Sequence, residues 1–180
     1  IWKKYTWEDY YQGVKCFSLG LVDLGLKPGD KVAIIGDNDP QWYLAEFAVQ
    51  AAGGTAVGVF QDCVISEVKY IVDQSDARFV VAKDQEQVDK LLQLKEGLPK
   101  LERIIYWDPK GMSGYDEPIL MAFEEVAKQG EEYSKTHPGL FEQNVEKGNG
   151  DEVCFLAYTS GTTGLPKGAM VTYSNLLSYA

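Results

Sequence analysis

The residues best suited to chemistry in this chain form one short run of hydroxyls and glycines that ends in a lysine. The run consists of Thr159, Ser160, Gly161, Thr162, Thr163, Gly164, Leu165, Pro166, Lys167 and Gly168. Its glycines permit positive φ angles, so several backbone N–H groups can point toward one ligand. The hydroxyls add rotatable donors, and Lys167 adds a flexible positive charge beside the φ-restricted Pro166. Such a combination suits a polyphosphate.

Two other phosphate-binding patterns do not fit this run. The P-loop G-x-x-x-x-G-K-[ST] requires glycine where Pro166 stands, and Gly168 follows the lysine. The dinucleotide pattern G-x-G-x-x-G does not occur either. Residues 153–158 are apolar and rich in strand formers, which predicts a buried strand leading directly into the run. A lysine-tipped loop delivered by a buried strand favours a binding role over an ordinary surface turn.

Helical and strand patterns alternate through the rest of the chain. We predict helices over 7–24, 40–52, 64–74, a segment capped by Asp84, and 118–128, and strands over 31–35, 55–60, 78–82, 102–107, 153–158 and 169–171. On the helix over 64–74, Val64 is expected on the apolar face with Val68, Ile71 and Val72. Strands separated by helices predict βαβ units, hence an α/β fold with a mainly parallel sheet covered by helices on both faces. Residues 1–180 are expected to form part of a single domain.

The composition excludes several classes of function. Seventeen Lys and Arg against 27 Asp and Glu give a net charge of -10, which argues against nucleic-acid binding and against a polybasic membrane surface. No apolar run approaches the ~20 residues of a membrane span, and no signal-peptide pattern opens the chain. Cys16, Cys63 and Cys154 lie far apart in apolar segments, which indicates reduced core thiols in a cytoplasmic protein. His137 is the one histidine, so no His-based metal cluster is expected.

The run over 158–168 resembles the ATP-phosphate loop of the adenylate-forming superfamily, which includes acyl-CoA synthetases, firefly luciferases and adenylation domains of peptide synthetases. Further segments are similar to the long-chain branch of the acyl-CoA synthetases, namely 24–34, 38–42, 51–60, 75–78 and 101–105. The likeness covers nearly all of residues 5–180. It identifies the chain as an excised N-terminal portion of the large AMP-binding domain of a long-chain fatty acid–CoA ligase, truncated after the phosphate loop.

The resemblance implies a two-step reaction that uses ATP, Mg²⁺ and coenzyme A. A fatty acid carboxylate attacks the α-phosphorus of ATP and releases pyrophosphate, and the thiol of coenzyme A then displaces AMP from the acyl-adenylate. The resemblance further implies that the phosphates contact Thr159, Ser160, Gly161, Thr162, Thr163, Gly164 and Lys167, with Thr162 and Thr163 as the key side chains. No catalytic residue and no metal ligand is expected within this chain, and Cys154 is expected to be a core residue.

One position departs from the family pattern, and several functions stay open. Many relatives carry His in the Thr-His-x-Asn after the loop, where this chain has Tyr173, which cannot be a cation near neutral pH. The alternatives are another adenylate-forming enzyme, such as an aryl-CoA ligase or adenylation domain, a non-catalytic nucleotide-binding module, and a plain interaction domain. Peripheral membrane association stays open as well. The isolated 180-residue chain is expected to be inactive and to self-associate through bare apolar surface.

Overall fold

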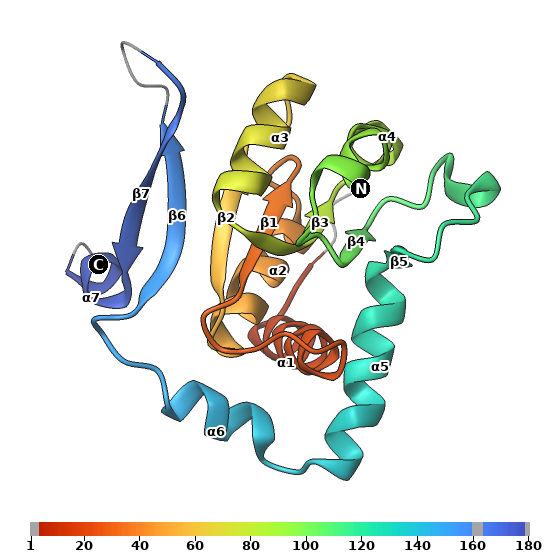
Figure 1. Cartoon of the computed structure of the whole chain (residues 1–180). Coiled ribbons are helices and arrows are strands. Elements are labelled where there is room, and N and C mark those ends of the chain that lie inside the picture. The colour runs from red at the N-terminus through yellow and green to blue at the C-terminus, as the bar shows by residue number, and fades with distance from the viewer. Residues whose placement is uncertain (1–3, 160–163, 179–180) are drawn as a thin grey trace.

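A computed structural model describes residues 4–159 and 164–178 of the chain (Figure 1). Its strands are β1 (Lys31–Ile35), β2 (Thr55–Val59), β3 (Ala77–Ala82), β4 (Arg103–Tyr106), β5 (Leu120–Ala122), β6 (Val153–Thr159) and β7 (Lys167–Thr172). Its α-helices are α1 (Trp7–Asp23), α2 (Pro40–Ala51), α3 (Ile65–Gln74), α4 (Gln85–Leu94), α5 (Phe123–Thr136), α6 (Leu140–Glu146) and α7 (Tyr173–Leu177). Short 3-10 turns cover Lys95–Gly97 and Met112–Gly114.

The described strands form one sheet in the order β5-β4-β3-β1-β2-β6-β7. Neighbouring strands from β5 to β6 run parallel, and β7 runs antiparallel to β6. The predicted α/β fold with a mainly parallel sheet is therefore confirmed. The predicted strand over 153–158 lies inside the sheet, because it pairs with β2 on one side and with β7 on the other.

Helices cover both faces of the sheet, as the sequence predicts. Successive strand residues point to opposite faces, so Val32 and Ile34 pack toward α1, α2 and α5 while Ala33 and Ile35 pack toward α3 and α4. All four side chains are fully buried. Burial of both faces explains why the inner strands are continuous apolar runs rather than alternating ones.

The ends of the helices follow from local sequence. The predicted capping box at α1 is present, since the Asp9 N–H donates to Thr6 Oγ1 at 3.1 Å and the Thr6 N–H donates to Asp9 Oδ2 at 2.8 Å. Asp39 precedes α2 as predicted, with Pro40 in the first turn, but its side chain does not cap the helix. The Asp39 carboxylate accepts hydrogen bonds from Lys83 at 3.1 Å and from Trp107 Nε1 at 3.3 Å instead.

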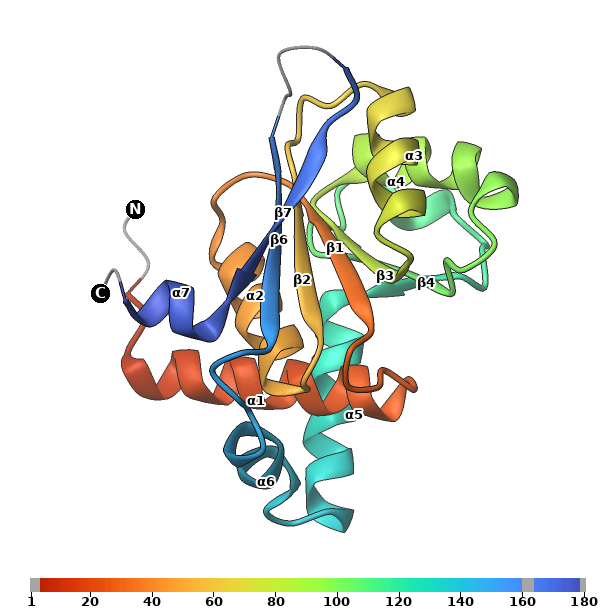
Figure 2. The ribbon, with the colours of Figure 1, turned by 60° about the vertical axis from the view of Figure 1, so that its left-hand side comes forward.

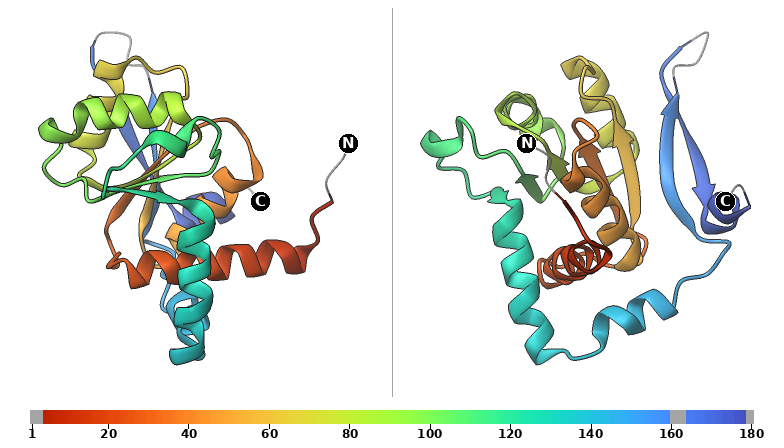
Figure 3. Two further views of the ribbon diagram at one scale, coloured as in Figure 1. Left: turned by 90° about the vertical axis from the view of Figure 1, so that its right-hand side faces the viewer. Right: turned by 180° about the vertical axis from the view of Figure 1, so that it is seen from behind.

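Helix α1 crosses α5 at very short range (Figure 3). A Cβ added at Gly20 would lie 2.1 Å from the carbonyl oxygen of Val126, and one added at Gly130 would lie 1.8 Å from that of Cys16. Close by, the rings of Phe17 and Phe123 stack with their centroids 3.8 Å apart. The two glycines therefore let the helix backbones approach, and α5 covers the end of the sheet that β4 and β5 form.

The predicted helix over 118–128 is wrong in its boundaries. Leu120–Ala122 forms β5, which pairs in parallel with β4 from Ile104 to Tyr106, and the helix α5 runs from Phe123 to Thr136. The backbone of β4 would otherwise lack a partner along that edge, and pairing with it outweighs the local helical pattern of a three-residue segment.

Two expectations about buried side chains also need correction. Val64 precedes α3 as its N-cap residue and is 58% exposed, so the buried face of that helix consists of Val68, Ile71 and Val72. Of the three cysteines, which all carry free thiols, only Cys154 is fully buried, and Cys16 and Cys63 are half-buried. Their segments are apolar, but the faces that carry these two thiols lie at the margin of the core.

Candidate phosphate-binding site

Three of the seven predicted phosphate-binding residues, Thr159, Gly164 and Lys167, lie in the described part of the hairpin that β6 and β7 form. Thr159 and Lys167 are paired in register as the last rung of this hairpin, and both side chains are exposed. Gly164 is also described and exposed. The other four predicted residues, Ser160, Gly161, Thr162 and Thr163, lie outside the described residues, and phosphate binding by all seven stays a prediction.

The carboxyl end of β6 and the start of β7 lie at the carboxyl ends of β1 and β2 (Figure 2). In open α/β sheets, ligands bind in the crevice outside the carboxyl ends of the parallel strands. β6 runs parallel to β2, so its end brings Thr159 to this edge. The antiparallel β7 begins there with Lys167. The fold therefore directs both ends of the predicted loop toward the edge where a nucleotide would be expected.

Tyr158 fixes the point at which the buried part of β6 ends. Its ring packs against the opposite strand, because a Cβ added at Gly168 would lie 3.1 Å from Tyr158 Cζ. Its hydroxyl donates a hydrogen bond to the side-chain oxygen of Gln74 at the end of α3. The sequence gives no sign that Gln74 contacts Tyr158, because only the folded chain brings α3 beside β6. Thr159 thus follows directly from a buried and anchored tyrosine.

The two lysines at this edge differ in their surroundings. Lys83, which follows β3, forms ion pairs with Asp37 at 2.7 Å and Asp39 at 3.1 Å, and these partners raise its pKa. Within residues 4–159 and 164–178, no carboxylate forms an ion pair with Lys167. Lys83 is therefore engaged in holding the loops after β1 and β3, whereas the charge of Lys167 is available to an anionic ligand.

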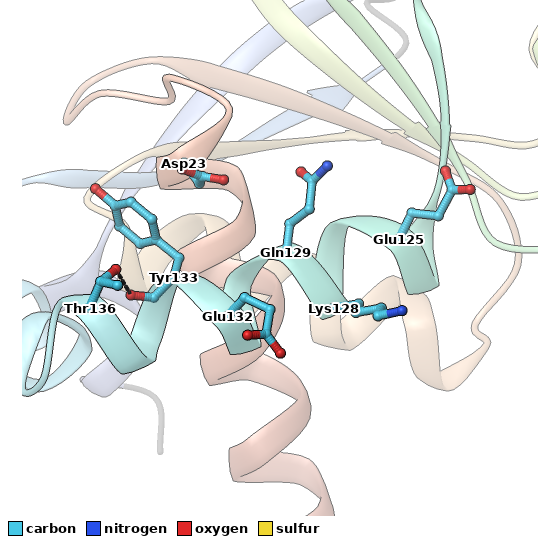
Figure 4. A pocket seen from close by; sticks show the side chains of 7 residues that line it. All are labelled: Asp23, Glu125, Lys128, Gln129, Glu132, Tyr133 and Thr136. Atoms are coloured by element: carbon cyan, nitrogen blue, oxygen red, sulfur yellow. Dashed lines mark hydrogen bonds between the residues drawn. The ribbon is translucent and has the colours of Figure 1, made fainter.

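Two hollows mark the described surface, and the larger one reaches Tyr158 and Gly168, the residues next to Thr159 and Lys167. A groove of about 1700 Å³ runs beside the hairpin base, and its lining includes Trp7, Tyr10, Phe47, Leu156 and Met170. A smaller hollow of about 520 Å³ lies between the end of α1 and α5 (Figure 4), with a lining of Asp23, Glu125, Lys128, Gln129, Glu132, Tyr133 and Thr136. Neither lining includes Thr159, Gly164 or Lys167.

The described residues include neither a metal-binding cluster nor a helix that could cross a membrane. They contain no cluster of three or more His, Cys, Asp or Glu side chains that could hold a metal ion. None of the helices described has the length and apolar character that a membrane crossing requires. His137 stacks on the ring of Tyr133, with the ring centroids 3.9 Å apart, which gives the histidine a local packing role.

Known proteins with similar sequences are long-chain fatty acid–CoA ligases. The ligase ACSBG2 of Xenopus laevis is 30% identical over 175 residues, which cover 97% of this chain and 23% of that protein. The ligase ACSBG1 of Rattus norvegicus is 28% identical over 178 residues, which cover 97% of this chain and 24% of that protein. The chain thus spans about a quarter of the length of these curated relatives.

Solved structures with the same fold include CoA ligases and synthetases. The anthranilate CoA ligase AuaEII, in complex with anthranoyl-AMP, matches with a TM-score of 0.79 and 23% identity over 95% of this chain and 30% of that chain. Acetoacetyl-CoA synthetase from Streptomyces lividans matches with a TM-score of 0.78 and 21% identity over 98% of this chain and 27% of that chain. At these identities the likeness establishes the fold alone.

The family description "AMP-binding enzyme" matches residues 1–180, the whole of the chain. This match agrees with the parallel sheet, with the hairpin at its carboxyl edge, and with relatives that are acyl-CoA ligases. The chain belongs to the family of AMP-binding enzymes.

Proposed function

We propose that the full-length protein is an ATP-dependent long-chain fatty acid–CoA ligase whose ATP phosphates bind at residues 159–167. The observation that carries this proposal is the last rung of the hairpin, which places the exposed Thr159 opposite the exposed Lys167 at the carboxyl edge of the sheet. The similarity to long-chain fatty acid–CoA ligases at 28–30% identity supports the substrate class. We place the protein in the cytoplasm and leave peripheral membrane association open.

In this proposal the chain's own residues act on the leaving group of the first half-reaction. When the acid attacks the α-phosphorus of ATP, negative charge grows on the departing pyrophosphate. Lys167 and the hydroxyl of Thr159 would stabilise that charge, together with Ser160, Thr162, Thr163 and the backbone N–H groups of the loop. A phosphate site needs positive charge and donors that are not already engaged. Lys167 is exposed and forms no ion pair within residues 4–159 and 164–178, so it fits this requirement.

Mg²⁺ is expected to reach the site as a complex with ATP. Since the described residues hold no cluster of three or more acidic, His or Cys side chains, the phosphates themselves would supply most of its ligands at this end of the nucleotide. When bound, the ion neutralises phosphate charge. We assign no residue of this chain to it.

The proposal requires no covalent enzyme intermediate. Cys154 precedes the loop on β6, but it is fully buried, and its thiol donates to the carbonyl oxygen of Val171 at 3.3 Å. Burial raises the pKa of the Cys154 thiol, which disfavours the thiolate that a nucleophile needs. The acyl group would therefore pass from AMP to coenzyme A directly.

The decisive experiment measures the two half-reactions of the full-length protein separately. Replacement Lys167→Ala should slow fatty-acid-dependent exchange of labelled pyrophosphate into ATP by about 100-fold, the size of effect seen when one stabilising donor is removed. Thioester formation from a supplied acyl-adenylate should be unchanged. Lys128→Ala, on α5 and far from the hairpin tip, is the matched control and should leave both steps unchanged. An unchanged first step with an impaired second step would overturn the assignment of Lys167.

A panel of acids separates the alternative functions. Pyrophosphate exchange that depends on long-chain fatty acids supports the proposal, whereas exchange that requires aromatic acids or amino acids indicates another adenylate-forming enzyme. ATP binding without exchange for any acid indicates a non-catalytic nucleotide-binding module. An interaction domain would show no effect of ATP on thermal stability.

The isolated 180-residue chain should not catalyse adenylation. It spans about a quarter of its relatives' length, and we propose that the remaining ATP contacts and the acid site belong to the other three quarters. Exposed contacts between ATP and the loop, at ~0–1 kcal/mol each, would leave the affinity at about millimolar or weaker. Pyrophosphate exchange by this chain well above its own Lys167→Ala variant would contradict this expectation.

A further inference from the structure

In the return arm of the hairpin, residues 167–178, a tyrosine side chain reaches from the hairpin to helix α2. The backbone N–H groups of Tyr173 and Ser174 donate to the carbonyl oxygens of Glu152 and Gly150, at 3.2 and 2.8 Å. Both of these hydrogen bonds lie within the base of the hairpin. The hydroxyl of Tyr173 donates to the carbonyl oxygen of Gln50 on α2, at 3.1 Å. In the part of the chain that the structure describes, this is the one hydrogen bond between the return arm and anything outside 150–178.

Strand β6, unlike the return arm, is attached to the sheet by backbone pairing with a neighbouring strand. β6 pairs with β2 over three residue positions, from Ala56 to Gly58, and Thr55 Oγ1 donates to the carbonyl oxygen of Val153 at 2.9 Å. β7 pairs with β6 and with no other described strand. The position of β7 therefore depends on β6 along one side and on Tyr173 at its base.

The acceptor of the Tyr173 hydroxyl is well suited to hold it. Gln50 lies in the last turn of α2, where carbonyl groups lack helical partners and carry partial negative charge. Its carbonyl oxygen also accepts from the Gly53 N–H at 2.9 Å. The side chain of Gln50 is buried and donates to Glu46 Oε1 at 3.3 Å, so the acceptor residue is itself held in place.

The surroundings of Tyr173 keep its hydroxyl protonated at neutral pH, so that it can donate a hydrogen bond. The titratable groups that affect it are Cys154 on β6 and Glu152 just before β6, and Glu46 lies near Cys154 from the α2 side. Burial, with smaller effects of Cys154 and Glu152, raises the pKa of Tyr173 to about 12. The neutral hydroxyl therefore persists over the pH range in which an enzyme of this class would work.

We propose that Tyr173 is a positioning residue for Lys167, because its hydroxyl fixes the base of the return arm against α2. The proposal rests on the proposed function, since it concerns the same loop. Five residues lie between Lys167 and Tyr173, and the six steps of extended chain from one to the other make a lever of about 20 Å. A small rotation at the base is thus enlarged at Lys167, and misplacement of a binding group by about 1 Å can cost ~100-fold in rate.

The first test measures the attachment itself, with or without enzymatic activity. Tyr173→Phe keeps the ring and removes the donor, and Tyr43→Phe, an exposed tyrosine on α2, is the matched control. In the full-length protein, amide hydrogen exchange followed by mass spectrometry should be faster by about 5- to 10-fold over 167–172 in Tyr173→Phe, the change expected for one lost hydrogen bond. Exchange over 103–106 in β4, and over both segments in Tyr43→Phe, should be unchanged.

The second test asks whether the attachment serves the phosphates. In pyrophosphate exchange, the KM for ATP of Tyr173→Phe should rise about 5-fold while the KM for the fatty acid stays the same. Tyr173→His, whose shorter ring leaves its N–H out of reach of the Gln50 carbonyl oxygen, should show a similar rise and provides a second variant if Tyr173→Phe does not fold.

Two results would overturn the proposal. Unchanged exchange over 167–172 would show that the hydroxyl does not hold the return arm. An equal rise of both KM values would show that Tyr173 stabilises the protein in general and does not position Lys167. If the wild-type protein shows no pyrophosphate exchange with any acid, the proposed function fails, and the hydrogen-exchange comparison alone then decides whether Tyr173 holds the arm.

Discussion

The five strands from β5 to β2 and the hairpin of β6 and β7 are parts of one sheet with very different surroundings. Phe79 on β3 and Ile34 on β1 are fully buried, because helices cover the sheet on both faces there. In the hairpin, most residues of β6 are half-buried, no residue of β7 is fully buried, and Met170 on β7 is 71% exposed. We call the first region the body and the second the hairpin.

The contrast separates the part that holds the fold from the part that would hold the ligand. Regions with few buried apolar contacts open locally at lower free energy than the core does. A hairpin that is attached along one strand and at its base can adjust around a ligand while the body stays intact. Substitutions in the body should therefore change global stability, and those in the hairpin should act mainly on ligand binding.

The largest effect on stability is expected from Phe79→Ala. Removal of this fully buried ring should lower the free energy of unfolding by about 3–5 kcal/mol. The half-buried Phe155 of the hairpin, which packs beside Trp42, should cost about 1–2 kcal/mol on replacement by Ala. Urea unfolding of both variants gives the comparison, and equal costs would show that the hairpin belongs to the same cooperative core as the body.

The crossing of α1 and α5 gives a second test of the body. Gly130→Ala would place a methyl group 1.8 Å from the carbonyl oxygen of Cys16, so the helices must separate, at a cost of about 1–3 kcal/mol. Gly114→Ala is the control, since a Cβ there meets no atom within 4 Å, and it should change stability by less than ~0.5 kcal/mol. A Gly130→Ala variant as stable as the control would mean that the crossing is loosely packed.

The sequence predicts the body better than its margins, for physical reasons. The structure agrees within one residue with the predicted ends of β1 (Lys31–Ile35) and α2 (Pro40–Ala51). The sequence marks these ends clearly, for example with Pro40 in the first turn of α2. β5 was missed because three residues are too few to show a period, and pairing with β4 determines its structure. Local patterns contain no information about such a partner.

The candidate site divides in the same way. A strand before the loop and a returning strand after it could be predicted, because apolar residues and glycines mark them. The first strand was expected to be buried, but only Cys154 and Tyr158 of β6 are. Two contacts could not be predicted, those of Tyr158 with Gln74 and of Tyr173 with Gln50, because each joins segments that are distant in the sequence. The single signal available was the unusual tyrosine at position 173, which identifies the position but not its partner.

Helix α6 leads the chain from the body to the hairpin, and its attachment gives a smaller effect. Glu142 on α6 accepts hydrogen bonds from Lys15 and Tyr11 on α1, and the bond from Lys15 is the main cause that lowers its pKa from 4.5 to about 2. A carboxylate with a lowered pKa stabilises the fold above its unfolded pKa, and that contribution is lost as the pH falls through its folded pKa.

Glu142→Gln should therefore lower the unfolding free energy near pH 7 by at most ~0.5–1 kcal/mol, because the pair is largely exposed to solvent. The difference from the wild type should shrink as the pH falls from 4.5 toward 2. Urea unfolding over this range measures it. A difference that is constant with pH would mean that the ion pair contributes nothing and that α6 is held by Phe141 alone.

The smallest effect on stability is expected from Met170→Lys in the hairpin. Met170 is 71% exposed, so the change should alter the unfolding free energy by less than ~0.5 kcal/mol. The same change should reduce self-association of the 180-residue chain, because a charge on an edge strand opposes strand pairing between molecules. Sedimentation of the two chains at equal concentration provides the measurement, and unchanged association would place the contact elsewhere.

The packing of α1 on α5 has a consequence for how the protein is made. Phe17 on α1 stacks on Phe123 of α5, and the two helices are separated in sequence by most of the body. On the ribosome α1 emerges before α5, and the part of its apolar face around Phe17 lacks its α5 partner until Phe123 has left the exit tunnel. Non-local contacts of this kind form late and expose apolar surface in the meantime. A nascent chain that stalls before α5 should therefore be a target for chaperones at α1, although every strand from β1 to β4 has already been synthesised.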